Sequence, residues 1–129
     1  MPVTNHTAKP VLVLASSSPN RLELLQSAGM HPDIITPPDI NETPLKGELP
    51  KDFVLRMAKE KADSVREKHQ NCFIISADTI ISCRQQIIGK AETEKEARKT
   101  LNSLSGRRHR VYSGLCVIAP SGKTSVKAV

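Results

Sequence analysis

The sequence predicts a single domain of the α/β class, and three observations support this prediction. The chain has 129 residues, which is long enough for one modest hydrophobic core. Its residues are 38% apolar and 25% charged, as in folded globular proteins rather than disordered ones. Strand-like apolar runs alternate with helical patterns along the chain, which is typical of α/β proteins.

The first elements follow from a short apolar run and a helix start signal. Val11–Ala15 is apolar and ends at three serines, which predicts a buried strand. Ser18, followed by a proline, is a good helix N-cap, and Gly29 suits the position after the last turn. These signals predict a helix over 19–28, and we expect a second strand over 33–36.

The middle of the chain predicts two helices and a long strand. A proline-rich loop, PPDINETPLKGELP, leads into a helical pattern over 50–68. The stretch CFIISADTIISC predicts a strand over 72–83, and RQQ predicts a turn into the short run IIG. Thr93 and Glu96 form a capping box that opens a helix to about Leu104.

The last part of the sequence predicts a hairpin. RVYSGLCVIA is strand-like, Ser121 and Gly122 form a turn, and TSVKAV begins a further strand. A chain that stops inside a strand looks cut, so we expect residues 1–10 to be a tail and 11–129 to be one domain, incomplete at its C-terminus. The exposed strand edge favours pairing with a second copy, so we expect a homodimer, aggregation or partial unfolding.

The composition excludes several classes of protein. Three aromatic residues are too few for stacking-based binding of single-stranded nucleic acid. The three cysteines form no C-x-x-C pair, which is typical of a cytosolic protein without a disulfide framework or zinc site. The longest apolar run near the start has five residues, too few for a signal peptide or membrane span. We therefore expect a cytoplasmic protein with no membrane partner.

The net charge of +6 is unevenly distributed. Residues 1–83 hold nine Lys or Arg against ten Asp or Glu, whereas residues 84–129 hold ten against three. A basic third of this kind can bind nucleic acid, and it can equally surround a site for a polyanionic small molecule. Charge alone leaves both alternatives open.

Lys61 stands out on the 50–68 helix. At about 100° per residue, counted from Phe53, five apolar residues fall between about 40° and 180°: Val54, Met57, Ala58, Ala62 and Val65. Lys61 falls at about 80°, in the middle of this apolar face. Its side chain either snorkels to the edge of the face or pairs with an anionic group in a cleft.

Asp78 lies within FIISADTIIS, with apolar residues on both sides. A buried carboxylate there needs a cation, a metal or hydrogen-bond donors, and an Asp at a strand bend capped by local amides is the alternative. Glu42 in DINET and Lys90 in IIGKAE are unremarkable on their own. The basic stretch SGRRHRVYSG also fits a plain turn with a solvated face.

The segment LASSSPNRLELL joins the first strand to the first helix. Three small hydroxyl residues and an arginine at this joint fit simple helix capping. They also fit an anion site, because the amides of a helix N-terminus attract negative charge. Both interpretations use the same amides and are compatible.

Six motifs, in order and spacing, resemble the Maf family of nucleotide pyrophosphatases, also called septum formation inhibitors. They are LASSSPNRLELL, DINETP, LRMAKEKA, ISADTII, IIGKAE and LSGRRHRVYSG, spanning about residues 11–119. The resemblance implies a cytoplasmic α/β enzyme with an elongated, ITPase-like mixed sheet flanked by helices. It also implies house-cleaning hydrolysis of nucleoside triphosphates to a monophosphate and pyrophosphate, with a divalent cation, Mg²⁺ or Mn²⁺.

The resemblance also implies roles for single residues. Asp78 matches the family's acid/base carboxylate, and together with Glu42 it would hold the metal ion. Thr79 follows this aspartate as in members that act on dTTP and UTP, whereas the branch that prefers methylated guanosine nucleotide has Gln there. The residues that match substrate-binding positions are Ser16, Ser18, Arg21, Lys61 and Lys90.

The sequence departs from the family pattern at three places. Asn20 stands where the family has the first arginine of S-P-R-R, a position tied to the choice of base. Ala91 replaces the usual proline after Gly-Lys. The family's C-terminal portion, with its Gln-containing motif and closing strands, is expected to be missing.

Electrostatics and the resemblance lead to the same mechanism. A triphosphate carries about four negative charges, and Arg21, Lys61 and Lys90 would neutralise the charge that grows on the leaving pyrophosphate. Asp78 would orient the attacking water as a base or act mainly as a metal ligand. The alternatives are an inactive truncated fragment and a basic nucleic-acid-binding protein, the latter favoured only by the charge of residues 84–129.

Overall fold

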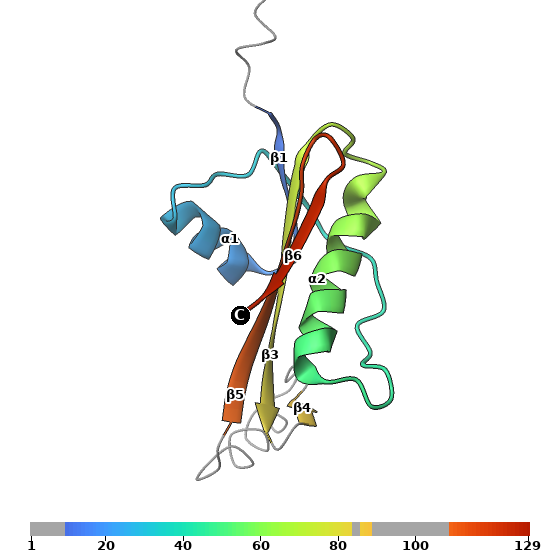
Figure 1. Ribbon diagram of the computed structural model, residues 1–129. Helices are drawn as coiled ribbons and strands as arrows, with labels where there is room; N and C mark the ends of the chain where they lie inside the picture. Colours follow the sequence, from blue (N-terminus) through green and yellow to red (C-terminus); the bar gives the residue numbers. More distant parts are fainter. Residues whose placement is uncertain (1–9, 84–85, 89–108) are drawn as a thin grey trace, which may run out of the picture.

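The computed structural model describes residues 10–83, 86–88 and 109–129, which form one mixed β-sheet with a helix on each face (Figure 1). The elements are, in chain order, β1 (Leu12–Ala15), α1 (Pro19–Ser27), β2 (Ile34–Thr36), α2 (Pro50–Arg66), β3 (Phe73–Cys83), β4 (Gln86–Ile88), β5 (His109–Ile118) and β6 (Thr124–Ala128). The predicted α/β class, with a mixed sheet flanked by helices, is confirmed.

In the described residues, the sheet has six strands in the order β2-β1-β3-β5-β6, with β4 pairing with β3 outside this path. Strand β1 runs parallel to β2 and β3. Strand β3 pairs antiparallel with β4 and β5, and β5 pairs antiparallel with β6. The longest pairing joins β3 to β5, from Ile74 opposite Ile118 to Cys83 opposite His109, so these two strands form the centre of the sheet.

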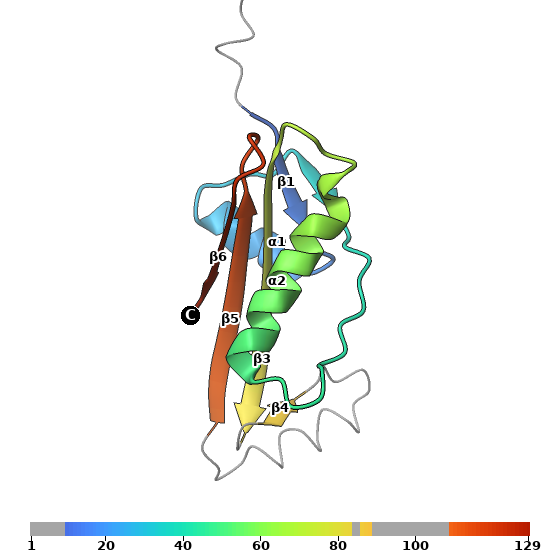
Figure 2. The same ribbon diagram turned by 45° about the vertical axis from the view of Figure 1, so that its right-hand side comes forward.

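Helix α2 packs on one face of the sheet and builds the core (Figure 2). Its predicted apolar face is buried, and every second residue of β3 is buried beneath it, as expected for a strand with one covered face. Each aliphatic side chain buried in this way stabilises the fold by about 1.5–3 kcal/mol. The core residues of α2 and β3 include Phe53, Val54, Met57, Ala58, Ala62, Val65, Ile74 and Ile80.

Helix α1 lies on the opposite face and is attached more loosely (Figures 1 and 2). None of its residues is fully buried, and Leu24 is 70% exposed. Its N-terminus is nevertheless well defined, because Ser18 Oγ accepts a hydrogen bond from the Arg21 amide. Helix α1 therefore adds little to the core and serves mainly to place its first turn against β3.

The element boundaries agree with the sequence prediction to within two residues. The helix predicted over 50–68 ends at Arg66, and the strand predicted over 72–83 begins at Phe73. The helix predicted from Thr93 lies outside the described residues, as do Lys90 and residues 1–9. Within the described part of the chain, neither helix has the length and apolar character that crossing a membrane requires.

Candidate active site

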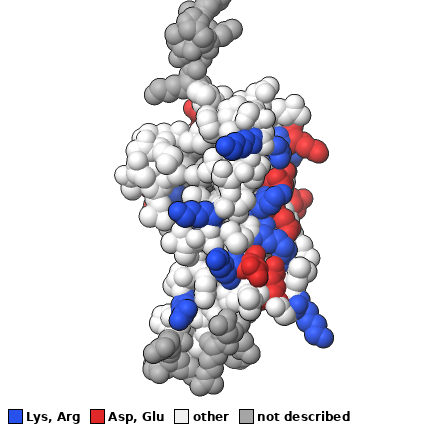
Figure 3. Space-filling view, viewed as in Figure 1, with Lys and Arg blue, Asp and Glu red and all other residues white. Residues whose placement is uncertain are grey.

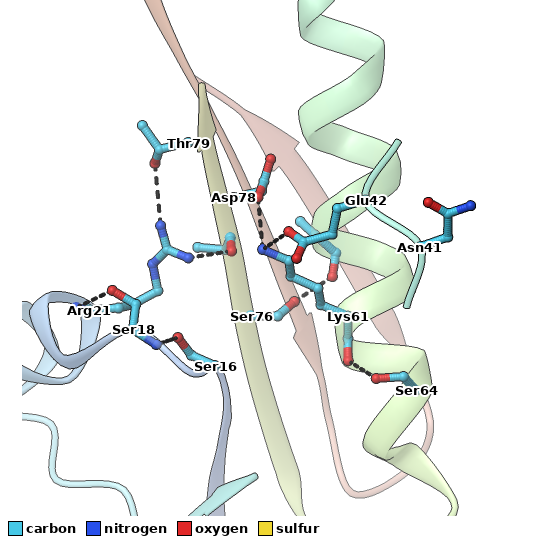
Figure 4. Close-up of polar contacts among 12 residues, drawn as sticks. Ser16, Ser18, Arg21, Asn41, Glu42, Lys61, Ser64, Ser76, Asp78 and Thr79 are labelled. Atoms are coloured by element: carbon cyan, nitrogen blue, oxygen red, sulfur yellow. Dashed lines mark hydrogen bonds and ion pairs between the residues drawn. The ribbon is translucent and has the colours of Figure 1, made fainter. Parts of the chain in front are cut away.

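A buried ion pair joins α2 to β3. The Lys61 Nζ atom lies 2.8 Å from Oδ1 of Asp78, and the two side chains are only 7% and 8% exposed (Figure 4). Lys61 reaches Asp78 because helical side chains point back toward the helix N-terminus. Asp78 points toward α2 because β3 alternates its side chains between the two faces. Of the two alternatives for Lys61, the structure shows pairing with an anionic group and not snorkelling. Of the alternatives for Asp78, it shows a cation partner.

Glu42 completes this cluster from the segment between β2 and α2. Its Oε1 atom lies 3.2 Å from Lys61 Nζ, and its side chain is 51% exposed. The ammonium group therefore bridges one buried carboxylate and one that faces solvent (Figure 4). The second carboxylate oxygen of Asp78, Oδ2, is buried and has no hydrogen-bond partner among the described residues. A buried unpartnered oxygen costs free energy, and this one is available to accept a proton or to bind a ligand.

Arg21 approaches β3 from the other face of the sheet. Its Nη1 atom donates to the carbonyl oxygen of Ala77 at 2.6 Å, and Nη2 lies 3.5 Å from Oγ1 of Thr79 (Figure 4). The Thr79 hydroxyl is in turn 3.0 Å from Oγ of Ser113 on β5. The arginine thus contacts the two residues that flank Asp78 in sequence.

Arg21 contacts the middle of β3, between the part that pairs with β1 and the part that pairs with β4. Strand β1 pairs with residues 73–75 of β3, and β4 pairs with residues 81–83. Residues 76–80 lie between these pairings, with Asp78 at their centre. Cationic groups from α1 and α2 therefore reach the same stretch of β3 from its two faces.

The serines of the β1–α1 joint are engaged in local hydrogen bonds. Ser16 Oγ accepts from the Ser18 amide at 3.0 Å, and Ser18 Oγ accepts from the Arg21 amide at 3.4 Å. The capping interpretation is confirmed, whereas the anion-binding interpretation stays a prediction. Asn20, in the first turn of α1, is exposed. Lys90, the remaining predicted phosphate-binding residue, lies outside the described residues.

Three residues beside this cluster were missed by the sequence analysis: Ser76, Ser113 and Gly114. Ser76 is fully buried and donates its hydroxyl hydrogen to the Ala58 carbonyl oxygen, and Gly114 is the register partner of Asp78. A hydroxyl on the apolar face of a strand is a signal that the alternating pattern could have revealed. No pattern in one sequence gives the register that pairs β3 with β5.

The two carboxylates fit a hard divalent cation. Among the described residues, no three His, Cys, Asp or Glu side chains converge as a closed metal cage. Mg²⁺ usually does not need such a cage, because one or two carboxylates, water and substrate phosphates complete its coordination. Asp78, with its unpartnered Oδ2 atom, and the half-exposed Glu42 supply donors of this kind.

Comparison with known proteins assigns the chain to a family. The family model for Maf-like proteins matches residues 11–129, so the chain belongs to the Maf family. It is 48% identical over 119 residues to a dTTP/UTP pyrophosphatase of Paramagnetospirillum magneticum, covering 92% of this chain and 63% of that protein. It is also 48% identical over 116 residues to a dTTP/UTP pyrophosphatase of Zymomonas mobilis, covering 90% of this chain and 57% of that protein. The chain thus spans less than two thirds of the length of these relatives.

Solved structures of distant proteins share the fold. A HAM1 protein from Coxiella burnetii matches with a TM-score of 0.57 at 18% identity, covering 93% of this chain and 70% of that one. A nucleoside-triphosphatase, or dITP/XTP pyrophosphatase, from Mycobacterium abscessus matches with a TM-score of 0.53 at 19% identity, covering 92% and 70%. At this identity, the similarity shows the fold alone, and it confirms the ITPase-like architecture.

Proposed function

We propose that this member of the Maf family is a nucleoside triphosphate pyrophosphatase that acts on dTTP and UTP. The observation that carries the proposal is the buried Asp78 carboxylate, which is held through one oxygen by Lys61 while its other oxygen has no partner among the described residues. The two relatives named dTTP/UTP pyrophosphatases support the choice of substrate. Thr79 after the aspartate supports the same choice.

In this proposal, the cationic groups bind the triphosphate. The Lys61 ammonium has three N–H donors and two carboxylate partners, so one donor remains for a phosphate oxygen. Arg21 and Lys90 would supply further positive charge, and the amides at the start of α1 would add the partial charge of a helix N-terminus. These groups stabilise the charge that develops on the leaving pyrophosphate.

Asp78 takes the proton that the attacking water loses. Its Oδ2 atom accepts a proton from the attacking water, whose oxygen forms a bond to the α-phosphorus. The bond from the α-phosphorus to the oxygen bridging to the β-phosphorus breaks, and pyrophosphate leaves with the electron pair. Glu42 would hold a Mg²⁺ or Mn²⁺ ion, which would neutralise phosphate charge, and Asp78 would be a second ligand in the alternative in which it does not act as the base. The same proposal places the enzyme in the cytoplasm, where it would remove unwanted nucleotides.

The test is release of pyrophosphate from dTTP, UTP and 7-methyl-GTP, with Mg²⁺, with Mn²⁺ and with EDTA. We expect turnover of dTTP and UTP that depends on the cation. Asp78→Asn should lower the rate by about 10²–10⁴, the usual effect of losing a general base. It should also lower the melting temperature, because Lys61 loses its buried counter-ion and keeps only Glu42, so rates are compared at a temperature at which both proteins are folded. Asp52→Asn, at an exposed position in the first turn of α2, is the control and should be as active as the unchanged protein. Activity of Asp78→Asn within about tenfold of the unchanged protein would remove Asp78 from the catalytic role.

Nucleic-acid binding has less support in the described residues. Figure 3 shows acidic and basic side chains side by side along the α2 edge, and the basic side chains elsewhere on this face stand singly. A protein surface that binds nucleic acid needs a continuous patch or stripe of basic side chains. A DNA mobility-shift assay across salt concentrations checks this, because phosphate contacts weaken steeply as salt rises.

A further inference from the structure

Helix α2 touches the sheet through its own backbone at two points. Ser76, fully buried on β3, donates its hydroxyl hydrogen to the carbonyl oxygen of Ala58 (Figure 4). Gly114 on β5 faces the carbonyl of Val54, where an added β-carbon would lie 2.2 Å from the oxygen and 2.6 Å from the carbon. Because both distances are far shorter than a van der Waals contact, only glycine allows this approach.

These two contacts surround Asp78. Ser76 lies two residues before Asp78 on the same face of β3, and Gly114 is directly opposite Asp78 in the β3–β5 register. The small side chains on both strands therefore leave room for α2 at the point where the buried carboxylate stands. A larger side chain at either position would separate the helix from the carboxylate.

The same two contacts determine the position of Lys61. Val54 and Ala58 are one turn apart on α2, so their carbonyls fix both the height and the rotation of this part of the helix. Lys61 follows within the next turn, and its side chain extends back toward the helix N-terminus. The Nζ atom lies 2.8 Å from Asp78 and 3.2 Å from Glu42, so a small shift of the helix would break at least one contact.

Ser76 and Gly114 both depart from an ordinary apolar core, and both belong to the close approach of α2 to the sheet. A buried hydroxyl in an apolar core costs free energy unless it is hydrogen-bonded, and glycine within a strand weakens the strand. Alanine in place of Ser76 would avoid the buried hydroxyl, whereas even alanine in place of Gly114 would collide with the Val54 carbonyl. Both departures from a normal core occur next to the one buried carboxylate of the described residues.

We propose that Ser76 and Gly114 are positioning residues of the active site. They hold α2 at the separation from β3 and β5 at which the Lys61 ammonium contacts both carboxylates. This inference rests on the proposed function for its kinetic consequence, whereas the geometry of the ion pair can be measured without any nucleotide.

The first test compares two serines whose hydroxyls both donate to carbonyls of α2. Ser76 bonds from the sheet to Ala58, whereas Ser64 bonds within the helix to Lys61, at 2.8 Å. Ser76→Ala should weaken binding of a non-hydrolysable α,β-imido analogue of UTP, with Mg²⁺, by on the order of tenfold, as for contacts that are coupled. Ser64→Ala should change this affinity less than about twofold. Equal effects of the two substitutions would overturn the proposal.

The second test asks whether Ser76 acts through Lys61. In a Lys61→Gln background, Ser76→Ala should cause no further loss of analogue affinity, because the ammonium group that it positions is already gone. Ser76→Ala should likewise lower kcat in the unchanged protein and not lower it further in the Lys61→Gln background, and KM should change less than kcat. If the two losses multiply instead, Ser76 has a purely structural role.

The third test needs no nucleotide. In ¹⁵N-resolved NMR, the ammonium protons of Lys61 should be protected from exchange in the unchanged protein and in Ser64→Ala, and unprotected in Ser76→Ala and Gly114→Ala. If Gly114→Ala fails to fold, Ser76→Ala alone decides. Absence of analogue binding by the unchanged protein contradicts the proposed function, whereas the NMR comparison still supports or overturns the positioning role. An unchanged Lys61 signal in Ser76→Ala would overturn it.

Discussion

Two cations of α2 are placed in the same way and have different surroundings. Arg56 and Lys61 both extend from α2, and each contacts a glutamate of the segment between β2 and α2. Arg56 binds Glu48, and Lys61 binds Glu42. The first cluster is complete in its hydrogen bonds, whereas the second leaves a buried oxygen unpartnered within the described residues.

The Arg56 cluster satisfies both carboxylate oxygens of Glu48. The guanidinium Nε atom lies 2.7 Å from Oε2 and Nη2 lies 2.8 Å from Oε1, which also accepts from the Leu45 amide. Glu60 takes a third hydrogen bond at 2.9 Å. The hydrogen bond from Arg56 lowers the pKa of Glu48, and that from Glu48 raises the pKa of Arg56. A fork of this geometry is strong and leaves little capacity for a ligand.

The Lys61 cluster has the opposite properties. A point-like ammonium holds one oxygen of Asp78, and the other, deep beside the sheet, has no partner in the part of the chain that the structure describes. Networks that are fully satisfied stabilise a fold, whereas a partly satisfied network costs stability and persists where it serves a function. The comparison therefore predicts that the Arg56 cluster contributes mainly stability, and that the Lys61 cluster contributes binding and catalysis.

The largest effect is expected from breaking the buried pair. Lys61→Met alone should lower the free energy of unfolding by about 3–5 kcal/mol, because Asp78 is left as a buried charge without its cation. The double variant Lys61→Met/Asp78→Leu should regain most of this stability and still fail to bind triphosphate. Urea unfolding and calorimetric titration with the imido analogue measure the two quantities. Unchanged affinity in the double variant would show that the cluster is structural.

Arg56→Met should show the complementary result. Removing the fork should cost about 1.5–3 kcal/mol of stability, the usual contribution of hydrogen bonds to charged groups. Analogue affinity should fall far less than in the Lys61 double variant, because Arg56 reaches the site indirectly, through a 3.2 Å hydrogen bond from Nη2 to the carbonyl oxygen of Thr43 next to Glu42. A loss of affinity as large as that of the Lys61 double variant would remove the distinction between the clusters.

A smaller effect is expected when the Glu48 charge alone is removed. The pKa of Glu48 is lowered from the ordinary 4.5 by its hydrogen bonds to Arg56, so the stabilisation is present above pH 4.5 and is lost as pH falls through the lowered value. Glu48→Gln should therefore be less stable than the unchanged protein at pH 7, and the difference should shrink below pH 4.5. Urea midpoints at pH 7, 5 and 3.5 measure this, and a difference that is constant with pH would contradict it.

The sequence predicted the charged residues of the site, Lys61 and Asp78, and missed Gly114, which positions the helix beside them. Lys61 was identifiable because helical periodicity places it among apolar residues, and Asp78 because it interrupts an apolar strand. Those signals are local. The role of Gly114 depends on its register with Asp78 and on contact with α2, which are long-range properties. The position of Arg21 on the other face of β3 also follows from the strand alternation only after α1 is placed.

The smallest effect is expected at a third cation of the same helix. Lys59 is 56% exposed, and its Nζ atom lies 2.8 Å from Oδ2 of Asp63, one turn away. This hydrogen bond raises the pKa of Lys59, but water screens an exposed pair, which typically contributes about 0.2–1 kcal/mol. Lys59→Met removes the same charge from α2 as Lys61→Met does, without touching Glu42 or Asp78.

Lys59→Met therefore separates general electrostatic attraction from specific contact. If triphosphate affinity depended on the positive field of α2, both lysine substitutions would weaken it alike at low salt, and high salt would abolish both effects. If affinity depends on the placed ammonium group of Lys61, Lys59→Met should change it less than about twofold at every salt concentration. Titrations at 20 mM and 300 mM salt decide between these outcomes. An equal, salt-sensitive loss in both variants would assign the binding to charge alone and leave the buried pair without a specific role.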